Sequence, residues 1–253
     1  MDHTERRTAY RAPRTVSVVV PALDEAAGIG ASLASVAGQA GPWEVVVADG
    51  GSADGTPEAV RAAMPEARLI APGRGRARQM NAGAEAATGD VLLFLHADTR
   101  LPAGALDAVR RALADPAVAA GCFRTAFDLD GAAEAPRFGP VGRAVMGLWE
   151  ARLWMRWHRL AFGDRAIFAR RTAFEAAGGF PDQPLLEDLD AVRALRRQGR
   201  FVFLDAAVTT SARRFRRHGA VRQQARNLAI WAGWTLGVAP ARLKRFYSDR
   251  DRG

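Results

Sequence analysis

The chain has 253 residues, of which 49% are hydrophobic and 25% are charged, and its formal net charge is +9. Apart from the charge, these values are ordinary for a soluble globular protein with one large or two small α/β domains. The single cysteine, Cys122, excludes an intrachain disulfide and a cluster of thiolate ligands to a metal.

The positive charge is almost entirely guanidinium, because only one of the 36 basic residues is a lysine, Lys244. Arginine suits bidentate contacts with phosphate, so the candidate partners are phosphorylated ligands, anionic lipid surfaces and nucleic acid. GC-rich codon usage would raise the arginine content without functional meaning, and this alternative stays open.

The first residues and the longest apolar run indicate where in the cell the protein is expected. Residues 1–14 are polar, lack the apolar core of a signal peptide and are predicted to form a disordered basic arm. The longest mostly apolar run, Leu228 to Pro240, is too short to span a bilayer. We therefore expect a cytoplasmic protein, with peripheral contact at the inner membrane face as an alternative.

Short apolar runs alternate with helical segments in the first half of the chain. Strands are predicted over 16–20, 44–48, 68–71 and 91–95, and helices up to about 39, over about 57–64, and up to Gly89-Asp90. Strands that alternate with helices at this spacing predict a largely parallel sheet.

The second half is less regular. We expect a helix near 103–114, a strand over 119–127, a long helix over 141–162, a strand over 164–169, a helix from 185–190 to 198, a strand over 201–204, and helices after an arginine-rich stretch beyond 211. No repeat or linker is visible, so one domain is predicted over 15–253. Its nucleotide-binding half covers about 15–115, its acceptor half about 116–215 and its C-terminal helical part about 216–248.

Two segments combine tryptophan with arginine in the pattern of an interfacial helix. The first, 141–162, carries Trp149, Trp154 and Trp157 beside an arginine stripe. The second repeats this more weakly, with Leu228, Trp231, Trp234 and Val238. Helices that simply pack on the sheet, with arginine outside, are the favoured interpretation, and a lipid or apolar acceptor at a membrane surface is the alternative.

Acidic residues follow three of the predicted strands, at Asp24-Glu25, Asp49 and Asp98. The carboxyl ends of parallel strands meet at one edge of a sheet, so these carboxylates can share a cleft with the arginines of the turn at 74–78. Carboxylates for a metal and arginines for phosphate suit a nucleoside diphosphate. Each cluster alone is more often a cap or a turn former.

The ordered set of motifs resembles family 2 glycosyltransferases. The motifs are Val18-Val19-Val20-Pro21 with Asp24-Glu25, Asp49-Gly50-Gly51-Ser52-Ala53-Asp54-Gly55-Thr56, Asn81-Ala82-Gly83, His96-Ala97-Asp98 and Glu187-Asp188. The resemblance covers about 15–215 and implies the GT-A fold, a Rossmann-like α/β fold with a mostly parallel sheet, here followed by C-terminal helices. Residues 75–83, the His-Ala-Asp variant and 210–214 look most like the branch labelled arsenosugar-biosynthesis glycosyltransferases.

The resemblance implies an inverting, metal-dependent hexosyltransferase that moves one sugar from a nucleoside diphosphate sugar to a hydroxyl acceptor. We expect the donor to be UDP-linked. Asp24, Glu25 and Asp49 would contact the base and ribose, and Asp98 would bind Mg²⁺ or Mn²⁺ at the diphosphate. Asp188, beside Glu187, would be the general base, with Asp190 as its competitor. The implied donor-binding residues are Pro21, Asp24, Glu25, Asp49, Gly51, Arg76, Arg78, Asn81, His96, Ala97, Asp98, Arg213 and Arg214.

One position departs from the family pattern. His96 replaces the first acid of the Asp-X-Asp motif, and as a second metal ligand its imidazole would favour Mn²⁺. The alternative is that His96 only packs beside the nucleotide. The Gln-X-X-Arg-Trp sequence of processive synthases is absent, which favours transfer of a single sugar.

Two other functions stay open at this point. A nucleotidyltransferase would need a glycine-rich basic loop after the first strand, where this chain has Ala22-Leu23-Asp24-Glu25. A nucleic-acid-binding module would show arginines and stacking aromatics on an open face, without acidic strand ends. We therefore expect no nucleic-acid partner. The sugar, the acceptor and the oligomeric state are not predicted.

Overall fold

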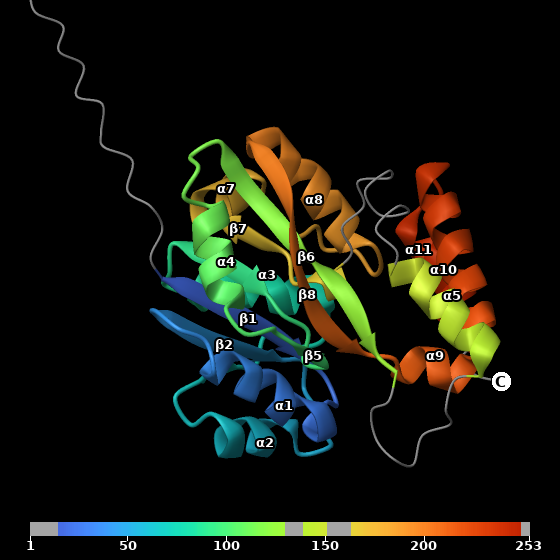
Figure 1. Ribbon diagram of the computed structural model, residues 1–253, viewed down its shortest axis with the longest axis horizontal. Helices are drawn as coiled ribbons and strands as arrows, with labels where there is room; N and C mark the ends of the chain where they lie inside the picture. The colour runs from blue at the N-terminus through green and yellow to red at the C-terminus, as the bar shows by residue number, and fades with distance from the viewer. Residues whose placement is uncertain (1–14, 130–138, 151–162, 249–253) are drawn as a thin grey trace, which may run out of the picture.

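A mixed sheet runs through the computed structural model, which describes residues 15–129, 139–150 and 163–248 (Figure 1). Within these residues the sheet has eight strands in the order β3-β2-β1-β4-β7-β6-β8-β5. The strands are β1 (Val16–Ala22), β2 (Trp43–Asp49), β3 (Arg68–Ile70), β4 (Val91–Phe94), β5 (Thr99–Arg100), β6 (Val118–Asp128), β7 (Phe168–Arg170) and β8 (Arg200–Ser211).

Helices lie on both faces of this sheet and beyond the ends of its two longest strands (Figure 1). They are α1 (Ala26–Ala37), α2 (Thr56–Ala63), α3 (Arg76–Ala86), α4 (Ala105–Ala112), α5 (Pro140–Glu150), α7 (Arg171–Ala176), α8 (Glu187–Gln198), α9 (Arg213–His218), α10 (Ala220–Thr235) and α11 (Pro240–Ser248), with a 3₁₀ turn, η1 (Gly163–Arg165). Helices α1, α2 and α4 pack in one apolar core, and α3, α7 and α8 pack in the other.

The valine-rich first strand separates these two cores. Val16, Val18 and Val20 face the core with α1, whereas Val19 faces α3. Every second residue of a strand points to the same face, so a strand buried on both sides reads as a continuous apolar run. Strand β1 pairs in parallel with β2 and β4, and β2 with β3.

The second half of the sheet mixes directions. Strand β7 is antiparallel to β4 and β6, β5 is antiparallel to β8, and the long strands β6 and β8 are parallel. Four of these seven pairings between described strands are parallel. The predicted α/β fold, with a mostly parallel sheet and C-terminal helices, is therefore confirmed.

The strand predicted over 164–169 is wrong in its first half. Residues 163–165 form the 3₁₀ turn η1, and β7 begins only at Phe168. Ala166 has a φ of +46°, in the left-handed region that interrupts an extended strand. This turn lets Asp164 point toward a pocket while Phe168 enters the core.

Other predicted bounds also change. The long helix of 141–162 is described only as α5, so the arginine stripe with Trp154 and Trp157 lies outside the described residues, as does the basic arm of 1–14. Strand β8 extends far beyond the predicted 201–204. Helix α7 was not predicted.

Helices α5, α9, α10 and α11 gather at one side of the molecule, beyond the ends of β6 and β8 (Figure 1). Two small apolar clusters hold them there. One joins Met146 of α5 to Phe215 and Ala220, and the other joins Leu186 and Leu189 to α10 and α11. Among the described residues, no helix is long and apolar enough to cross a membrane.

Candidate active site

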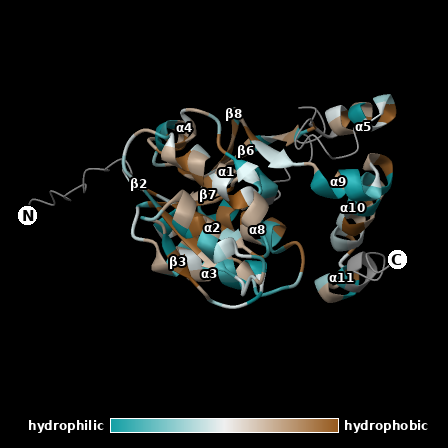
Figure 2. Cartoon of the chain, turned by 90° about the horizontal axis from the view of Figure 1, so that it is seen from below, coloured by the Kyte–Doolittle hydropathy of each residue, from teal (hydrophilic) through white to brown (hydrophobic). Residues whose placement is uncertain are grey.

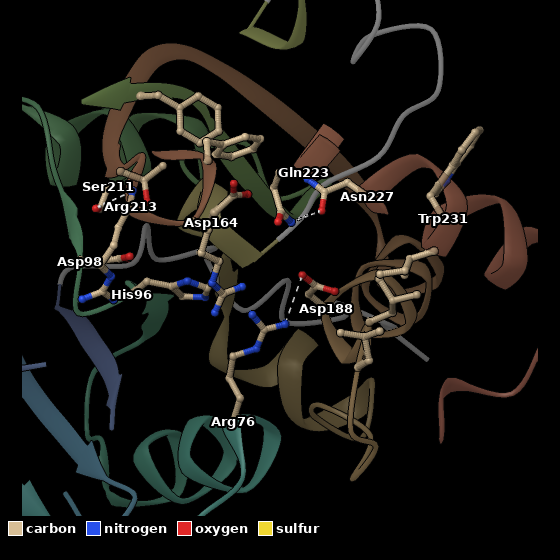
Figure 3. A pocket seen from close by; sticks show the side chains of 17 residues that line it. Arg76, His96, Asp98, Asp164, Asp188, Ser211, Arg213, Gln223, Asn227 and Trp231 are labelled. Atoms are coloured by element: carbon tan, nitrogen blue, oxygen red, sulfur yellow. Dashed lines mark hydrogen bonds and ion pairs between the residues drawn. The ribbon is translucent and has the colours of Figure 1, made fainter. Parts of the chain in front are cut away.

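A pocket of about 240 Å³ lies where the ends of β4 and β8 meet α8, α9 and α10 (Figure 3). Its lining combines acids, arginines and amides with several apolar side chains. The lining residues are Arg76, His96, Asp98, Phe127, Asp164, Leu185, Leu186, Asp188, Thr210, Ser211, Arg213, Arg214, Phe215, Gln223, Asn227, Ile230 and Trp231.

Asp98 reaches the pocket from the short loop between β4 and β5. The carbonyl oxygen of Asp98 accepts a hydrogen bond of 3.1 Å from the Ser211 amide, and Thr99 Oγ1 donates to Thr210 Oγ1 at 2.9 Å. These bonds tie the loop to the end of β8. The Asp98 carboxylate is thereby held at the pocket wall by a fixed backbone.

His96 lies two residues before Asp98 in the same loop. Burial and the neighbouring charges of Arg76 and Arg214 lower the pKa of His96 to about 3. The imidazole is therefore neutral at pH 7, and its buried Nε2 has no hydrogen-bond partner among the described residues. A neutral imidazole with an unpartnered ring nitrogen fits either a metal ligand or a hydrogen-bond partner of a bound substrate.

Glu187 and Asp188 begin α8 and are held by one arginine. Arg76 Nε donates to Glu187 Oε1, and Arg76 Nη2 lies 3.7 Å from Asp188 Oδ2. Burial opposes the charge on Arg76, but the carboxylates of Asp188 and Glu187 raise its pKa, so the guanidinium stays protonated. Leu186, immediately before this pair, has a φ of +63°, a strained conformation that turns the chain into the pocket wall.

Asp164 is a third pocket carboxylate, which was not predicted as a site residue. Burial raises the pKa of Asp164 to about 6, and the nearby charges of Asp188 and Asp98 act in the same direction, whereas Arg165 opposes them. Figure 3 shows Asp164 between Asp98 and Asp188 in that view. The signal was a charged pair, Asp164-Arg165, at the start of an apolar run, which reads equally well as the first turn of a strand.

Arg213 and Arg214 reach the pocket from α9. Arg213 Nη2 donates to Glu25 Oε1 at 2.7 Å, so this pair connects α9 to the turn after β1. The hydrogen bond to Glu25 raises the pKa of Arg213. Both arginines line the pocket, whereas Glu25 is outside its lining and is the partner of Arg213.

The other predicted acids shape the loop after β2. Asp49 Oδ2 accepts hydrogen bonds from the Gly51 and Ser52 amides, each at 3.0 Å, and Asp24 Oδ1 accepts from the Ala53 amide at 2.9 Å. Ser52 links the two, because its hydroxyl donates to Asp49 and accepts from the Asp24 amide. Asp24, Asp49, Gly51 and the strand residue Pro21 lie outside the pocket lining.

Three predicted donor-binding residues have other contacts. Arg78 pairs with the exposed Asp182 at 3.8 Å, and Ala97 is buried in the core with α1. The Asn81 amide group donates to the Phe180 carbonyl at 2.8 Å and accepts from the Phe180 amide at 2.9 Å. None of the three lines the pocket.

Gln79 was also not predicted, although its buried side chain joins two strand ends next to the site. Its Nε2 donates to the carbonyl oxygens of Ala22 and Ala48, at 2.7 and 2.8 Å. Ala22 and Ala48 lie at the carboxyl ends of β1 and β2, so one buried amide joins the two strand ends next to Asp24 and Asp49.

No group of three or more histidine, cysteine, aspartate and glutamate side chains is gathered as a complete metal site within the described ranges. Asp98 and His96 nevertheless fit a partial one. Mg²⁺ typically binds one or two carboxylates together with substrate phosphates and water, so a single protein carboxylate is enough when the ligand supplies a diphosphate.

The sequence of residues 17–175 matches the family model described as glycosyl transferase family 2. The chain belongs to glycosyl transferase family 2. This family match favours a glycosyltransferase over the nucleotidyltransferase and the nucleic-acid-binding module. The closer resemblance to the arsenosugar branch is not confirmed. No curated protein matches the sequence.

Solved structures of similar fold include complexes with nucleotide sugars. S. aureus TarS 1-349 in complex with UDP-GlcNAc is 19% identical, with a TM-score of 0.61 over 78% of this chain and 58% of that one. The mannosyltransferase PcManGT from Pyrobaculum calidifontis, in complex with GDP-Man and Mn²⁺, is 25% identical, with a TM-score of 0.59 over 87% and 65%.

A third structure is glucosyl-3-phosphoglycerate synthase from Mycobacterium tuberculosis, in complex with Mn²⁺, UDP and its product. It is 21% identical, with a TM-score of 0.53 over 77% of this chain and 70% of that one. The chain spans less than two thirds of the length of the TarS and PcManGT chains. The shared architecture supports the predicted GT-A fold.

Proposed function

We propose that this family 2 glycosyltransferase transfers one sugar, with inversion, from a nucleoside diphosphate sugar to a hydroxyl group of its acceptor. The observation that carries this proposal is the pocket, which brings Asp98, Asp188 and the arginines Arg76, Arg213 and Arg214 together from distant parts of the sequence. A cavity whose lining combines acids with arginines suits a diphosphate leaving group and an activated hydroxyl.

The donor side is assigned to Asp98 with His96, Arg213 and Arg214. Asp98 would hold Mg²⁺ or Mn²⁺, and the unpartnered Nε2 of His96 is the second candidate ligand. When bound, the ion would supply positive charge to the departing diphosphate. The two arginines would supply further positive charge from α9, because guanidinium groups bind phosphate oxygens in bidentate fashion. A UDP donor is favoured, since TarS and the mycobacterial synthase are described with UDP ligands.

The acceptor side is assigned to Asp188. In Figure 3 the Asp188 carboxylate lies across the pocket from Asp98, as a base must if the acceptor attacks opposite to the leaving group. Asp188 would take the proton of the acceptor hydroxyl, and Arg76 would orient its carboxylate. Asp190 is the weaker candidate, because it pairs with Gln183 and Arg193 and is not among the pocket residues.

The apolar part of the pocket lining indicates the kind of acceptor. Phe127, Phe215, Ile230 and Trp231 form it, and Gln223 and Asn227 add two amides within it. Gln223 Nε2 donates to Asn227 Oδ1 at 3.0 Å, which orients both amides toward the cavity side of α10. We assign this part of the lining to an acceptor with an apolar or lipid-linked part next to its hydroxyl.

A thermal-shift panel of UDP, GDP, ADP and CMP, with and without Mn²⁺, tests the donor site. A ligand at about 100 times its Kd adds roughly 2.7 kcal/mol to the free energy of unfolding. We expect one nucleoside diphosphate to stabilise the protein in a metal-dependent way, with loss of the effect in Asp98→Ala. Asp182→Asn, an exposed carboxylate outside the pocket, is the matched control.

The thermal shifts of the two variants decide whether the donor site is assigned correctly. Metal-dependent stabilisation by UDP that Asp98→Ala removes and Asp182→Asn keeps would support the assignment. No shift with any nucleotide, or an equal loss in both variants, would refute the donor site. Inversion is then read from the anomeric configuration of the product by NMR.

A further inference from the structure

The apolar surface of the molecule is concentrated on its C-terminal helices. Among the described residues, six large apolar side chains are exposed, and all of them lie on α5, on α10 or in the turn after α10. They are Val141, Leu148, Val221, Leu228, Leu236 and Val238, with 77% exposure at Leu148 and 84% at Leu236. Figure 2 shows apolar segments on α5 and α10, outside the main body of the sheet. Single exposed apolar residues are normal, but this clustering is not.

Helix α10 is apolar outside and polar inside. Its exposed apolar positions, Val221, Ala225, Leu228, Ala229 and Ala232, form one stripe with helical spacing, which Leu236 continues just after the helix. Thr235 is exposed as well. Arg222 is its only exposed charged residue. The buried face carries Gln223, Gln224 and Arg226 besides Ile230 and Trp234. A surface helix in water normally has the reverse arrangement, so the stripe points to an apolar medium or partner.

Helix α5, which contacts α10, adds a second stripe of the same kind. Pro140, Val141, Ala144, Gly147 and Leu148 are exposed on it, with Arg143 as the exposed charged residue. Residues 141 and 148 are seven apart, and so are 221 and 228, which places each pair on one side of its helix. The two stripes are defined here as the apolar face.

Charge decides what covers this face. Residues 206–248 contain nine arginines and lysines and no acidic residue. Arg213 and Arg214 line the pocket and Arg226 is buried, whereas the side chains of Arg217, Arg222, Arg242 and Lys244 are exposed outside the pocket. A second copy of the chain would bring the same cations to the interface, where like charges oppose association. Anionic lipid headgroups are complementary to these cations, and the acyl region beneath the headgroups accepts the apolar side chains.

We propose that the apolar face of α5 and α10 docks on the surface of an anionic lipid bilayer. The two tryptophans of α10, which the membrane-surface alternative would place on the outer side of the helix, are not part of this face. Trp234 is buried beneath the guanidinium of Arg193, 3.5 Å from the ring centroid, and Trp231 lines the pocket. Because α10 carries the apolar face on one side and the pocket wall on the other, docking would bring the acceptor side of the pocket to the lipid surface.

Vesicle co-sedimentation of the full chain tests the proposal without reference to activity. We expect the protein to bind vesicles that contain phosphatidylglycerol at low salt, with at least a tenfold lower partition onto phosphatidylcholine alone. Val221→Glu with Leu236→Glu should reduce the partition onto anionic vesicles at least tenfold. Ala62→Glu with Ala114→Glu adds the same charge at exposed sites away from the apolar face and should bind like the wild type.

Three results would overturn the proposal. The first is no binding of the wild type to anionic vesicles. The second is an equal loss of vesicle binding in both double variants. The third is a wild type that does not bind vesicles but self-associates, with the self-association abolished by Val221→Glu with Leu236→Glu. The last would assign the face to a second copy, which light scattering would show. The metal-dependent nucleotide shift, measured on the same variants, keeps this outcome separate from failure of the donor site.

Discussion

Arg76 Nη2 lies 3.7 Å from Asp188 Oδ2, while Arg76 Nε donates to Glu187, so a single guanidinium holds both acids at the start of α8. The two carboxyl side chains are only 2% and 5% exposed. Arg76 begins α3, more than a hundred residues earlier in the sequence. The contact therefore fixes the proposed general base, Asp188, relative to the donor half of the sheet.

Arg76→Gln should destabilise the fold, because it leaves two buried carboxylates without their cation. We expect a loss of about 2–4 kcal/mol in the free energy of unfolding, measured in urea. Arg76→Gln with Glu187→Gln should recover part of this loss, since it also removes one of the stranded charges. A single variant as stable as the wild type would show that the ion pairs contribute nothing to the fold.

Asp188→Asn should slow the transfer while the donor still binds. Loss of a general base lowers kcat by about 10²–10⁴-fold, and the nucleotide-induced thermal shift should stay close to that of the wild type. Asp190→Asn is the matched control, because Asp190 lies two residues along α8 and pairs with Gln183 at 2.9 Å outside the pocket. If Asp190→Asn lost the activity and Asp188→Asn kept it, the two roles would be exchanged.

The sequence predicted the first half of the fold well because the relevant signals there are local. Val16 to Val20 is apolar at every position, as a strand buried on both faces must be, and the turn residues after Asp49 mark where the next strand ends. The convergence of Asp98, Asp188 and Arg76 followed from strand ends and from the family resemblance, and the structure places all three in one pocket.

The remaining differences between the predicted and the observed structure have physical causes that the hydropathy pattern of the sequence does not encode. Asp164 was assigned to a strand because the reversal at Ala166 depends on a φ of +46°, which hydropathy does not encode. Trp231 and Trp234 were grouped with Leu228, yet both tryptophans face inward while Leu228 faces out. Periodicity predicts that a helix has two faces, but only packing decides which one is buried.

Asp164→Asn should stabilise the metal-free protein, and more so at neutral than at acidic pH. The pKa of Asp164 rises from 3.8 to about 6 on folding, so the folded state holds its proton more tightly. The contribution of Asp164 to the free energy of unfolding of the wild type is fully present below about pH 4 and is lost as the pH rises through 6. The variant should exceed the wild type by about 1–3 kcal/mol at pH 7 and by little at pH 4.

The comparison between variant and wild type is needed because His96 acts in the opposite sense. The pKa of His96 falls to about 3, so its contribution is lost as the pH falls below 6.5, equally in both proteins. Asp182→Asn is the matched control for the change of residue type. A stability difference for Asp164→Asn that does not depend on pH, in urea titrations with a chelator present, would contradict the prediction.

Gly83→Ala tests why a glycine stands in α3, where a helix interior would ordinarily favour alanine. A Cβ at this position would overlap Val19 Cγ1, because α3 lies directly on β1. Overpacking of this kind costs about 1–3 kcal/mol. Gly30→Ala in α1 is the matched substitution, since the nearest atom to its new Cβ is Ala63 Cβ at 3.9 Å.

The two variants should therefore change the free energy of unfolding with opposite signs. Gly30→Ala should gain up to about 1 kcal/mol through the lower backbone entropy of the unfolded chain. Gly83→Ala should lose stability and also weaken nucleotide binding, because a shift of α3 moves Arg76 and Gln79, which hold α8 and the ends of β1 and β2. Equal effects in the two variants, measured in urea, would show that α3 does not pack on β1 as closely as the structure requires.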